Sequence, residues 1–361
     1  MQYAFFISIL YSNIHFQLKT PMKMTMRWYG ADDPVKIAYI RQVPIVTGIV
    51  SALHDLPPGA AWSLERLNTH RESIEAHHLT WDVLESSSIT EAIKLGLPER
   101  DRDIEVYQQN IRNLAAAGVK VLCYNFMPVF DWTRTNLAKL NDDGSTALSY
   151  VHADVEAMDL SQGSGNLPGW SATYTGDQLR ALLAQYANVT RDDFFNNLVY
   201  FLKAVVPVAQ EVGVFMALHP DDPPWSLWGL PRIVTDANAL HRILQAVDNP
   251  HNGLTFCTGS LGVLAENDLP SMIRQFGSRI HFVHARNVER SGTRDFQETA
   301  HPHGDVPMRE VMQALADIGY QGAIRPDHGR MIWGEQGRPG YGLYDRALGA
   351  MYLWGLWEGV R

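Results

Sequence analysis

The sequence predicts an α/β protein whose strands close into a (β/α)8 TIM barrel. Along most of the 361-residue chain, apolar strand-like runs alternate with longer amphipathic segments, and the connections between them are short. This alternation favours a parallel sheet in which helices cross over between neighbouring strands. Eight such runs can be counted, which is the number that closes this barrel. An open doubly wound sheet is the alternative, but no glycine-rich phosphate-binding motif follows the first run.

The predicted strands are short apolar runs, and several of them end on a polar side chain. The first contains Ile45, Val46 and Thr47, whose β-branched side chains are typical of strands. The last leads into Asp327-His328-Gly329, where glycine permits the backbone to turn. The predicted strands cover residues 44–50, 79–85, 119–126, 214–218, 253–256, 279–283, 295–299 and 322–326.

Helix signals lie between several of these strands. Ser63 is suited to cap a helix that continues to His77, because its side chain can accept a bond from the first turn. Gly118, Gly213 and Gly319 are suited to end helices, since glycine tolerates the left-handed conformation at that position. The predicted helices cover residues 63–77, 101–117, 192–212, 240–247, 269–276 and 308–318.

Two segments depart from this pattern. Residues 141–189 are rich in Gly, Ser, Asp and Thr and are long for a connection inside a compact domain. We interpret them as an insertion over the top of the barrel that acts as a lid, and a passive surface excursion is an equally good alternative. Residues 1–21 are expected to be an N-terminal extension outside the fold, because no recognisable motif occurs there. Residues 22–361 are predicted to form a single barrel domain.

Composition excludes several kinds of partner. Hydrophobic residues make up 46% of the chain, which is ample material for a core. A net charge of -9 without a long basic run argues against a nucleic-acid partner. The apolar stretch at residues 1–10 is too short to span a bilayer, so no membrane partner is expected. Two cysteines cannot form a disulfide scaffold, and we therefore expect a reducing compartment, the cytoplasm.

Four predicted strands end on side chains that can bind a metal ion. These side chains are His219, Cys257, His284 and Asp327. In a (β/α)8 barrel the chemistry lies at the carboxyl ends of the strands. Because side chains alternate along a strand, one inward register can bring all four to the barrel axis. Two imidazoles, a thiolate and a carboxylate suit Mn, Fe(II), Zn or Co better than Mg or Ca.

Each of these residues also has a purely structural interpretation. A single histidine in a strand is more often a satisfied core residue, a single cysteine is more often a small buried hydrophobic residue, and Asp327 can cap the following turn. Four such residues at four strand ends make a chance arrangement the weaker explanation. His281 has the opposite parity to His284 and is interpreted as structural.

Polar and aromatic residues near the strand ends suit an anionic, polyhydroxylated substrate. Arg286 shares a face with His284 and can bind a carboxylate through two donors. His328 can transfer protons, and so can Tyr341, although a tyrosine between two glycines is more often part of a plain turn. The other candidate substrate-binding residues are Asn125, Glu85, Trp28, Tyr29 and His301.

Several long motifs occur in order from about residue 27 to the C-terminus. They are Arg27-Trp28-Tyr29-Gly30, Cys123-Tyr124-Asn125-Phe126-Met127-Pro128-Val129, Asp131-Trp132-Thr133-Arg134-Thr135, Leu218-His219-Pro220-Asp221-Asp222-Pro223, His284 with Arg286, and Arg325-Pro326-Asp327-His328-Gly329. Through these motifs the chain resembles the mannonate dehydratases of hexuronate degradation.

The resemblance implies a xylose-isomerase-like barrel that removes water from D-mannonate to give 2-dehydro-3-deoxy-D-gluconate. It also implies Mn(II) or Fe(II) at the positions of His219, Cys257, His284 and Asp327. In the family, a histidine matching His328 and a loop tyrosine transfer protons. We assign that tyrosine to Tyr341 rather than Tyr344, in a loop whose length varies. We also expect a homo-oligomer such as a dimer.

Two other functions fit parts of this pattern. A metal-dependent sugar isomerase on the same fold would use a similar ion, but such sites usually contain a lysine, and no predicted strand ends on one. A non-catalytic metal-binding protein would hold the ion without turning over any sugar acid. The absence of a nucleophile motif agrees with a dehydration, which needs proton transfer and a Lewis acid but no covalent intermediate.

Overall fold

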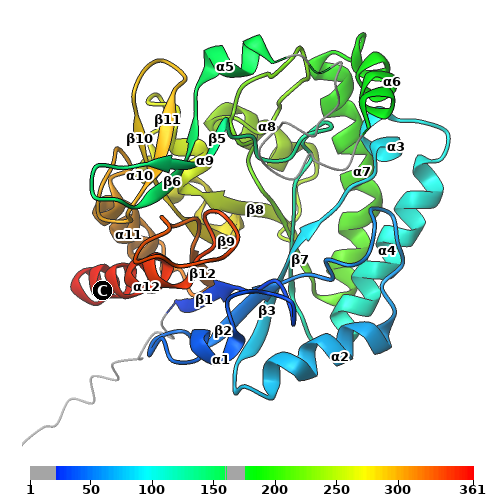
Figure 1. The fold of residues 1–361 in the computed structure, drawn as a ribbon. Helices are drawn as coiled ribbons and strands as arrows, with labels where there is room; N and C mark the ends of the chain where they lie inside the picture. Colours follow the sequence, from blue (N-terminus) through cyan, green and yellow to red (C-terminus); the bar gives the residue numbers. More distant parts are fainter. Residues whose placement is uncertain (1–21, 159, 161–174) are drawn as a thin grey trace, which may run out of the picture.

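The computed structural model describes residues 22–158, 160 and 175–361 of the chain. Within these residues, eight parallel strands close into a barrel, and helices surround it (Figure 1). This confirms the predicted α/β barrel. In their order around the barrel the strands are β1 (Lys23–Arg27), β12 (Ala323–Pro326), β9 (Ile280–Ala285), β8 (Asn252–Cys257), β7 (Phe215–Leu218), β4 (Val121–Tyr124), β3 (Thr80–Ser87) and β2 (Gly48–Ser51).

One barrel strand was predicted at the wrong place. Residues 295–299 do form a strand, but it lies outside the barrel, and the missing barrel strand is β1. Strands of a parallel barrel are buried on both faces and usually read as continuous apolar runs. In β1, Met24 and Met26 alternate with polar residues, and one of these, Arg27, pairs with Glu85 inside the barrel at 3.2 Å. Because of this buried ion pair, β1 has the alternating apolar and polar residues of a half-exposed segment. For this reason β1 was not recognised as a barrel strand in the sequence.

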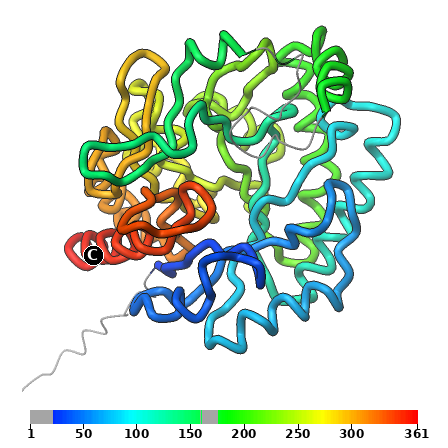
Figure 2. Tube along the Cα trace, viewed as in Figure 1, coloured from blue at the N-terminus to red at the C-terminus, as the bar shows by residue number. Residues whose placement is uncertain are grey.

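A second sheet in the described part of the chain joins two segments that are far apart in sequence. Its antiparallel strands, in the order β10-β11-β6-β5, are β10 (Asn287–Arg290), β11 (Phe296–Thr299), β6 (Thr146–Tyr150) and β5 (Asn136–Leu140). Figures 1 and 2 show the two segments side by side. The predicted insertion at residues 141–189 therefore contributes β6 to this sheet. Residues 159 and 161–174 of that insertion lie outside the described residues, as do residues 1–21, and a lid role stays a prediction.

The helices predicted from capping signals are present. The Ser63 side chain accepts a bond from the backbone N–H of Arg66 at 3.1 Å, and Gly118, Gly213 and Gly319 have φ angles of 85°, 73° and 65°. The described helices are α1 (Ile37–Ile40), α2 (Leu64–Glu75), α3 (Glu91–Leu95), α4 (Arg100–Ala116), α5 (His152–Ala157), α6 (Gly176–Tyr186), α7 (Arg191–Val212), α8 (Ala237–Ala246), α9 (Thr258–Gly262), α10 (Leu269–Phe276), α11 (Met308–Asp317) and α12 (Leu343–Val360), with a 3-10 turn at Gly277–Arg279.

The C-terminal helix α12 was not predicted from the sequence. Its apolar residues lie on all sides, so the 3.6-residue periodicity that marks a surface helix is missing. The inner side packs on β12 and α11. Tyr344, Leu348 and Met351 are exposed on the other side, next to the exposed ring of Trp333. No helix in the described ranges is both long and apolar enough to cross a membrane.

The barrel interior is filled by one small cluster of buried side chains. Its members come from β2, β3, β4, β7, β9 and β12, and they are Val50, Val83, Cys123, Ala217, Phe282 and Ala323. Ala217 precedes His219 by two positions, and Phe282 precedes His284 by two positions. Side chains two apart share a face of a strand, so both histidines continue the inward-facing rows to the mouth of the barrel. A larger core lies between the barrel and its helices.

Candidate metal centre and active site

The predicted metal ligands meet at the carboxyl ends of neighbouring barrel strands. His219 directly follows β7, Cys257 ends β8 and His284 lies near the end of β9, and one ligand atom from each lies within 4.8 Å of the others. Asp327 directly follows β12, the next strand around the barrel. Its Oδ2 atom lies 3.8 Å from Sγ of Cys257 and 3.9 Å from Nδ1 of His284. The four residues therefore come from four consecutive strands.

One ring nitrogen of each histidine faces the other candidate ligands. Nδ1 of His219 lies 2.7 Å from the carbonyl oxygen of Pro220, so it carries the proton and leaves the lone pair on Nε2. Nε2 of His284 is turned toward the Glu85 carboxylate at 3.5 Å. The two inner nitrogens, Nε2 of His219 and Nδ1 of His284, lie 3.1 Å apart, within hydrogen-bond distance of each other. Such orientation by a second acceptor is usual for histidines that bind metals.

The other two donors, Cys257 and Asp327, have polar or charged neighbours. The backbone N–H and the hydroxyl of Ser260 lie 3.4 and 3.1 Å from Sγ of Cys257, and both can donate to a thiolate. Burial alone would raise the pKa of Asp327, but the Arg325 guanidinium and other nearby cations hold it well below its usual value. One sulfur, one carboxylate and two imidazole nitrogens form a complete donor set for a transition-metal ion. The residues present thus fit a divalent cation.

The two residues predicted to transfer protons lie beside this donor set. Nε2 of His328 is 2.9 Å from the hydroxyl of Tyr341, and its Nδ1 is 2.8 Å from a carboxylate oxygen of Glu298. Burial, followed by the influence of Tyr29, raises the pKa of Tyr341 well above its ordinary value, so the phenol keeps its proton. Tyr344 is 44% exposed and packs against a surface tryptophan. The structure therefore places Tyr341, and not Tyr344, beside His328.

The backbone near β12 explains how Asp327 and His328 reach one cavity. Neighbouring residues within a strand point to opposite faces, but β12 ends at Pro326, before both of them. The backbone N–H of Gly329 then donates to the carbonyl of Gly340 at 2.8 Å, which brings the tyrosine loop back to the barrel. Gly340 has a φ of 78°, and a Cβ there would lie 2.7 Å from Cδ1 of Leu148 and 3.4 Å from His328. A side chain at this position would disturb the approach of the tyrosine loop to the barrel.

A cavity at the mouth of the barrel joins these groups. Four of the six predicted substrate-binding residues line it: Tyr29, Glu85, Asn125 and Arg286. Three of the four predicted metal ligands line it, whereas Cys257 does not, and so do both predicted proton-transfer groups. Its other lining residues are Ser86, Cys123, Tyr124, Asp131, Trp132, His219, Asp222, His284, Arg325, Asp327, His328 and Tyr341.

Trp28 and His301 do not line this cavity. Trp28 precedes Tyr29 and faces the opposite way, into the core outside the barrel, where its ring stacks on His70 with centroids 5.7 Å apart. His301 follows β11, which is not a barrel strand, so its position does not correspond to a strand end at the mouth. Its Nε2 donates to the carbonyl of Ala285 at 3.0 Å, and its ring lies against Gly349 of α12.

Arg286 is surrounded by acidic groups of the protein itself. Its Nη2 donates to Asp222 at 2.7 Å and to the Ser260 hydroxyl at 3.2 Å, and its Nη1 donates to Asp327 at 3.2 Å. Burial lowers the pKa of this guanidinium, but the carboxylate of Asp222 and other anions raise it well above its usual value. In this arrangement Arg286 neutralises the buried acids, and its donors are not free to bind a carboxylate with two parallel bonds.

The sequence prediction missed a group of buried charges next to the site. Arg134 donates to Asp222 at 2.8 and 3.1 Å and to Glu298 at 2.7 and 3.1 Å, and all three side chains are almost fully buried. Buried charges are tolerated only when they are paired. Arg134 and Asp222 lie within the motifs around residues 131–135 and 218–223, and this was the signal that could have identified them. Glu298 lies in no such motif.

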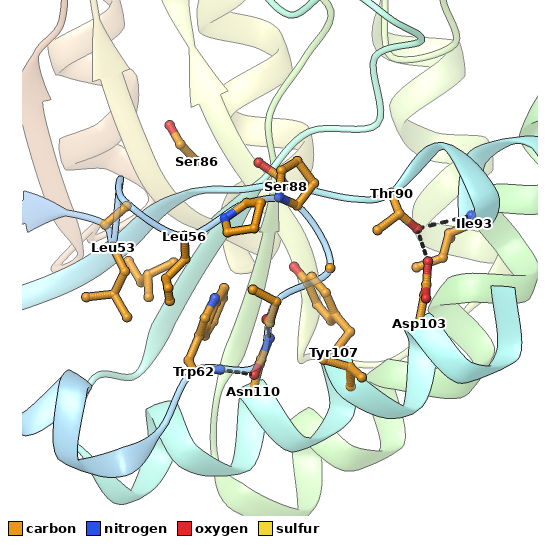
Figure 3. Close-up of a pocket in the computed structure, with 17 residues that line it drawn as sticks. Leu53, Leu56, Trp62, Ser86, Ser88, Thr90, Ile93, Asp103, Tyr107 and Asn110 are labelled. Atoms are coloured by element: carbon orange, nitrogen blue, oxygen red, sulfur yellow. Dashed lines mark hydrogen bonds between the residues drawn. The ribbon is translucent and has the colours of Figure 1, made fainter. Parts of the chain in front are cut away.

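A second cavity lies beside the first and shares Ser86 with it (Figure 3). It is lined by the loop after β2, the end of β3 and helix α4. Two of its labelled polar groups are bonded within the protein: Asn110 accepts from the backbone N–H of Trp62, and Thr90 donates to Asp103, both at 2.7 Å. In Figure 3, Tyr107 and Asn110 enter it from α4. None of the predicted metal ligands lines it.

Comparison with known proteins gives one consistent result. The family model described as D-mannonate dehydratase (UxuA) matches residues 22–361. A curated mannonate dehydratase of Halalkalibacterium halodurans is 52% identical over 343 residues, which cover 94% of this chain and 99% of that protein. The mannonate dehydratase of Thermotoga maritima is 52% identical over 353 residues, covering 94% of this chain and 98% of that protein.

Solved structures give the same result for the fold. The crystal structure of mannonate dehydratase from Streptococcus suis serotype 2 superposes with a TM-score of 0.87 at 46% identity and covers 94% of both chains. A xylose isomerase domain protein from Planctomyces limnophilus superposes with a TM-score of 0.57 at 13% identity, covering 94% of this chain and 99% of that one. The second likeness concerns the fold alone.

Proposed function

The chain belongs to the D-mannonate dehydratase family, and from this membership we propose that its barrel-mouth site removes water from D-mannonate to give 2-dehydro-3-deoxy-D-gluconate. The enzyme is a lyase that breaks a carbon–oxygen bond. We place the reaction in hexuronate catabolism, as the family resemblance implies. The observation that carries this proposal is that a possible metal-ligand set lies next to the His328–Tyr341 pair at the mouth of the barrel, where His219 and His284 of that set line the same cavity as the pair.

We propose that Mn(II) or Fe(II) is bound by His219, Cys257, His284 and Asp327. The mixed nitrogen, sulfur and oxygen donors support a transition metal over Mg or Ca. When bound, such an ion would act as a Lewis acid that stabilises negative charge developing next to the substrate carboxylate. The electrostatic setting supports this, because Arg325, Arg27 and Arg286 surround the site and balance its buried carboxylates.

The protein's own residues can complete the proton transfers. The reaction removes the proton at C2 and expels the hydroxyl at C3. His328 can accept the C2 proton at Nε2, and Tyr341 can protonate the leaving hydroxyl, which departs as water. The resulting imidazolium and phenolate are joined by the same hydrogen bond, so the proton passes from His328 to Tyr341 and restores the starting pair. The enol that remains becomes the keto acid by gaining a proton at C3 and losing the proton of its C2 hydroxyl.

An assay of keto-acid formation tests this function. Purified protein is treated with a chelator and then supplied with Mn(II), Fe(II), Zn(II) or no metal, and each sample receives D-mannonate or a related sugar acid. We expect keto acid from D-mannonate only in the metal-loaded samples, with Mn(II) or Fe(II) the most active. No keto acid from D-mannonate with any of these metals would refute the proposal.

The alternatives receive less support from the site. The cavity contains no lysine in the part of the chain that the structure describes, whereas a sugar isomerase of this fold would normally use one. A non-catalytic metal-binding protein would not need the neutral phenol of Tyr341 next to His328. The keto-acid assay separates these functions, because an isomerase would instead convert an aldose to a ketose.

Three further features are proposed with this function. The two cysteines are buried and unpaired, which supports a reducing compartment such as the cytoplasm. The exposed apolar side chains of α12 support a homo-oligomer such as a dimer. We also propose that a protein starting at Met22 keeps its fold and its activity. A truncated protein that is insoluble, or inactive in the keto-acid assay, would show that residues 1–21 are required.

A further inference from the structure

Glu298 reaches the active site from outside the barrel. It lies on β11 of the second sheet and is only 1% exposed. Both of its carboxylate oxygens face Nδ1 of His328, at 2.8 and 2.9 Å. No other carboxylate in the described residues lies within hydrogen-bond distance of that nitrogen, whereas Asp327 lies 3.8 Å from the other side of the ring. The second sheet therefore places the carboxylate of Glu298 next to the imidazole of His328.

The contacts of Glu298 show that its carboxylate is charged in the folded protein. Nε and Nη2 of Arg134 donate to Oε1 at 3.1 and 2.7 Å, and Arg286 lies 3.7 Å away. Burial by itself raises the pKa of Glu298, but His328 and these two guanidinium groups lower it below its ordinary value. An ionised carboxylate can only accept hydrogen bonds.

A carboxylate at this position decides which nitrogen of His328 carries the proton. If Nδ1 held a lone pair, two carboxylate oxygens would face it at less than 3 Å, which is repulsive. The Nδ1–H form instead makes a charge-assisted bond. Nη1 of Arg286 lies 3.3 Å from the same nitrogen and would favour the opposite form, but it is farther away. With Nδ1 protonated, Nε2 holds the lone pair and accepts from Tyr341.

We propose that Glu298 is a positioning residue for the dehydration: it fixes His328 in the tautomer whose Nε2 accepts the substrate proton, and it stabilises the imidazolium that forms. This inference rests on the proposed function of His328. The second sheet acquires a role through it, since β11 supplies Glu298 and the segment before β5 supplies Arg134, which holds Glu298 in place.

The test compares three variants. In Glu298→Gln, Arg134 retains the amide oxygen at the Oε1 position, and an amide nitrogen replaces the second oxygen that faces Nδ1. The negative charge is lost, and the N–H donors of that amide favour the wrong tautomer. We expect kcat to fall by about a hundred-fold or more, as for a misoriented catalytic histidine, while metal content and KM stay near the wild-type values. Glu298→Asp keeps the charge and should recover part of kcat. The matched control is Glu289→Gln on β10, an exposed glutamate of the same sheet.

A second measurement does not depend on activity. Spectra of the metal-free protein labelled with ¹⁵N-histidine report the tautomer of each ring, and the His328 signals are identified by their loss in His328→Asn. We expect the Nδ1–H form in the wild type and a shift away from it in Glu298→Gln. A wild-type protein with the proton on Nε2 would overturn the proposal, even if Glu298→Gln did not fold.

The outcomes separate this inference from the proposed function. Wild-type protein that produces no keto acid refutes the dehydratase proposal, whatever the spectra show. Active wild type together with a fully active Glu298→Gln refutes only the role of Glu298. Loss of metal or a raised KM in Glu298→Gln, without recovery in Glu298→Asp, would show that Glu298 merely supports the structure, and this result would also refute the proposal.

Discussion

The hydroxyl of Tyr341 and Nε2 of His328 lie 2.9 Å apart, although one residue follows β12 and the other lies at the end of a loop that leads into α12. The phenol retains its proton because burial raises its pKa, and the imidazole accepts that hydrogen bond. A direct bond between two proton-transfer groups allows the resting state to be restored without solvent. The first prediction follows from this pair.

Tyr341→Phe should remove turnover while leaving the metal in place. The variant keeps the ring but loses the acidic hydrogen, so we expect kcat to fall by roughly a hundred- to ten-thousand-fold. Tyr344→Phe is the matched control, because that side chain is partly exposed and lies on the surface of α12. Keto-acid kinetics and metal analysis on both proteins decide the matter. Equal losses in the two variants would contradict the assignment to Tyr341.

Asp327 and His328 are neighbours, but their substitutions should fail differently. Asp327→Asn removes an anionic ligand, so metal affinity should fall together with activity. His328→Asn should retain the metal and bind substrate, yet lose turnover by about a hundred- to ten-thousand-fold. Metal analysis and substrate titration distinguish the two. A His328→Asn protein that is purified without metal, or that turns over mannonate at the wild-type rate, would argue against this division of roles.

The two cysteines give a second matched pair. Cys257 lies at the metal-ligand set, whereas Cys123 belongs to the apolar cluster inside the barrel. Cys257→Ser should weaken metal binding and activity, because serine is a poor substitute for a thiolate ligand. Cys123→Ser should cost at most about 1–2 kcal/mol of stability, since Thr255 already donates to this position at 3.1 Å. Equal metal content in wild type and Cys257→Ser would remove Cys257 from the ligand set.

Acid should destabilise the protein through its buried carboxylates. Burial raises the pKa of Asp222, but Arg134 and Arg286 lower it far below the usual value. A depressed pKa in the folded state gives stability that is present above the unfolded-state pKa, about 3.9, and that is lost as the pH falls below it. We expect the free energy of unfolding to drop steeply below about pH 4.

Substituting Asp222 tests whether its carboxylate causes the loss of stability in acid. Asp222→Asn should be less stable at pH 7 by about 3–5 kcal/mol, because two buried guanidinium groups lose a partner, and its stability should depend less on acid. The exposed Asp192→Asn serves as the control for removing one carboxylate elsewhere. Denaturant unfolding at several pH values provides the measurement. An unchanged acid dependence in Asp222→Asn would assign the effect to other groups.

The exposed side of α12 should be the contact surface of a homo-oligomer. Leu348 and Met351 are 50% and 44% exposed and lie one turn apart on the helix, beside Tyr344 and Trp333. We expect the wild type to sediment as a dimer or larger species and Leu348→Glu to dissociate it. Leu140→Glu, at a 71% exposed site on β5, is the control. A monomeric wild type at micromolar concentrations would contradict this prediction.

Much of the metal site could be predicted from the sequence because the relevant information is local. Strands of a parallel barrel end at a common face, and the alternation of side chains along each strand shows which residue points inward. His219, Cys257, His284 and Asp327 could therefore be grouped before any contact was known. The same rule placed Tyr29 and Trp28 on opposite faces, although both were predicted to bind substrate.

Only the tertiary structure decided which distant residues complete the site. Arg134 and Glu298 are 164 positions apart, and they meet because two segments pair as one antiparallel sheet above the barrel. The strand β1 was hidden for a related reason: the charge of Arg27 is matched inside the barrel by Glu85, 58 positions later. Buried charges are stable only when their partners are in place, and sequence periodicity does not indicate those partners. The sequence thus determined the barrel and indicated a candidate ligand set, whereas the packing of remote segments brought Glu298 to His328.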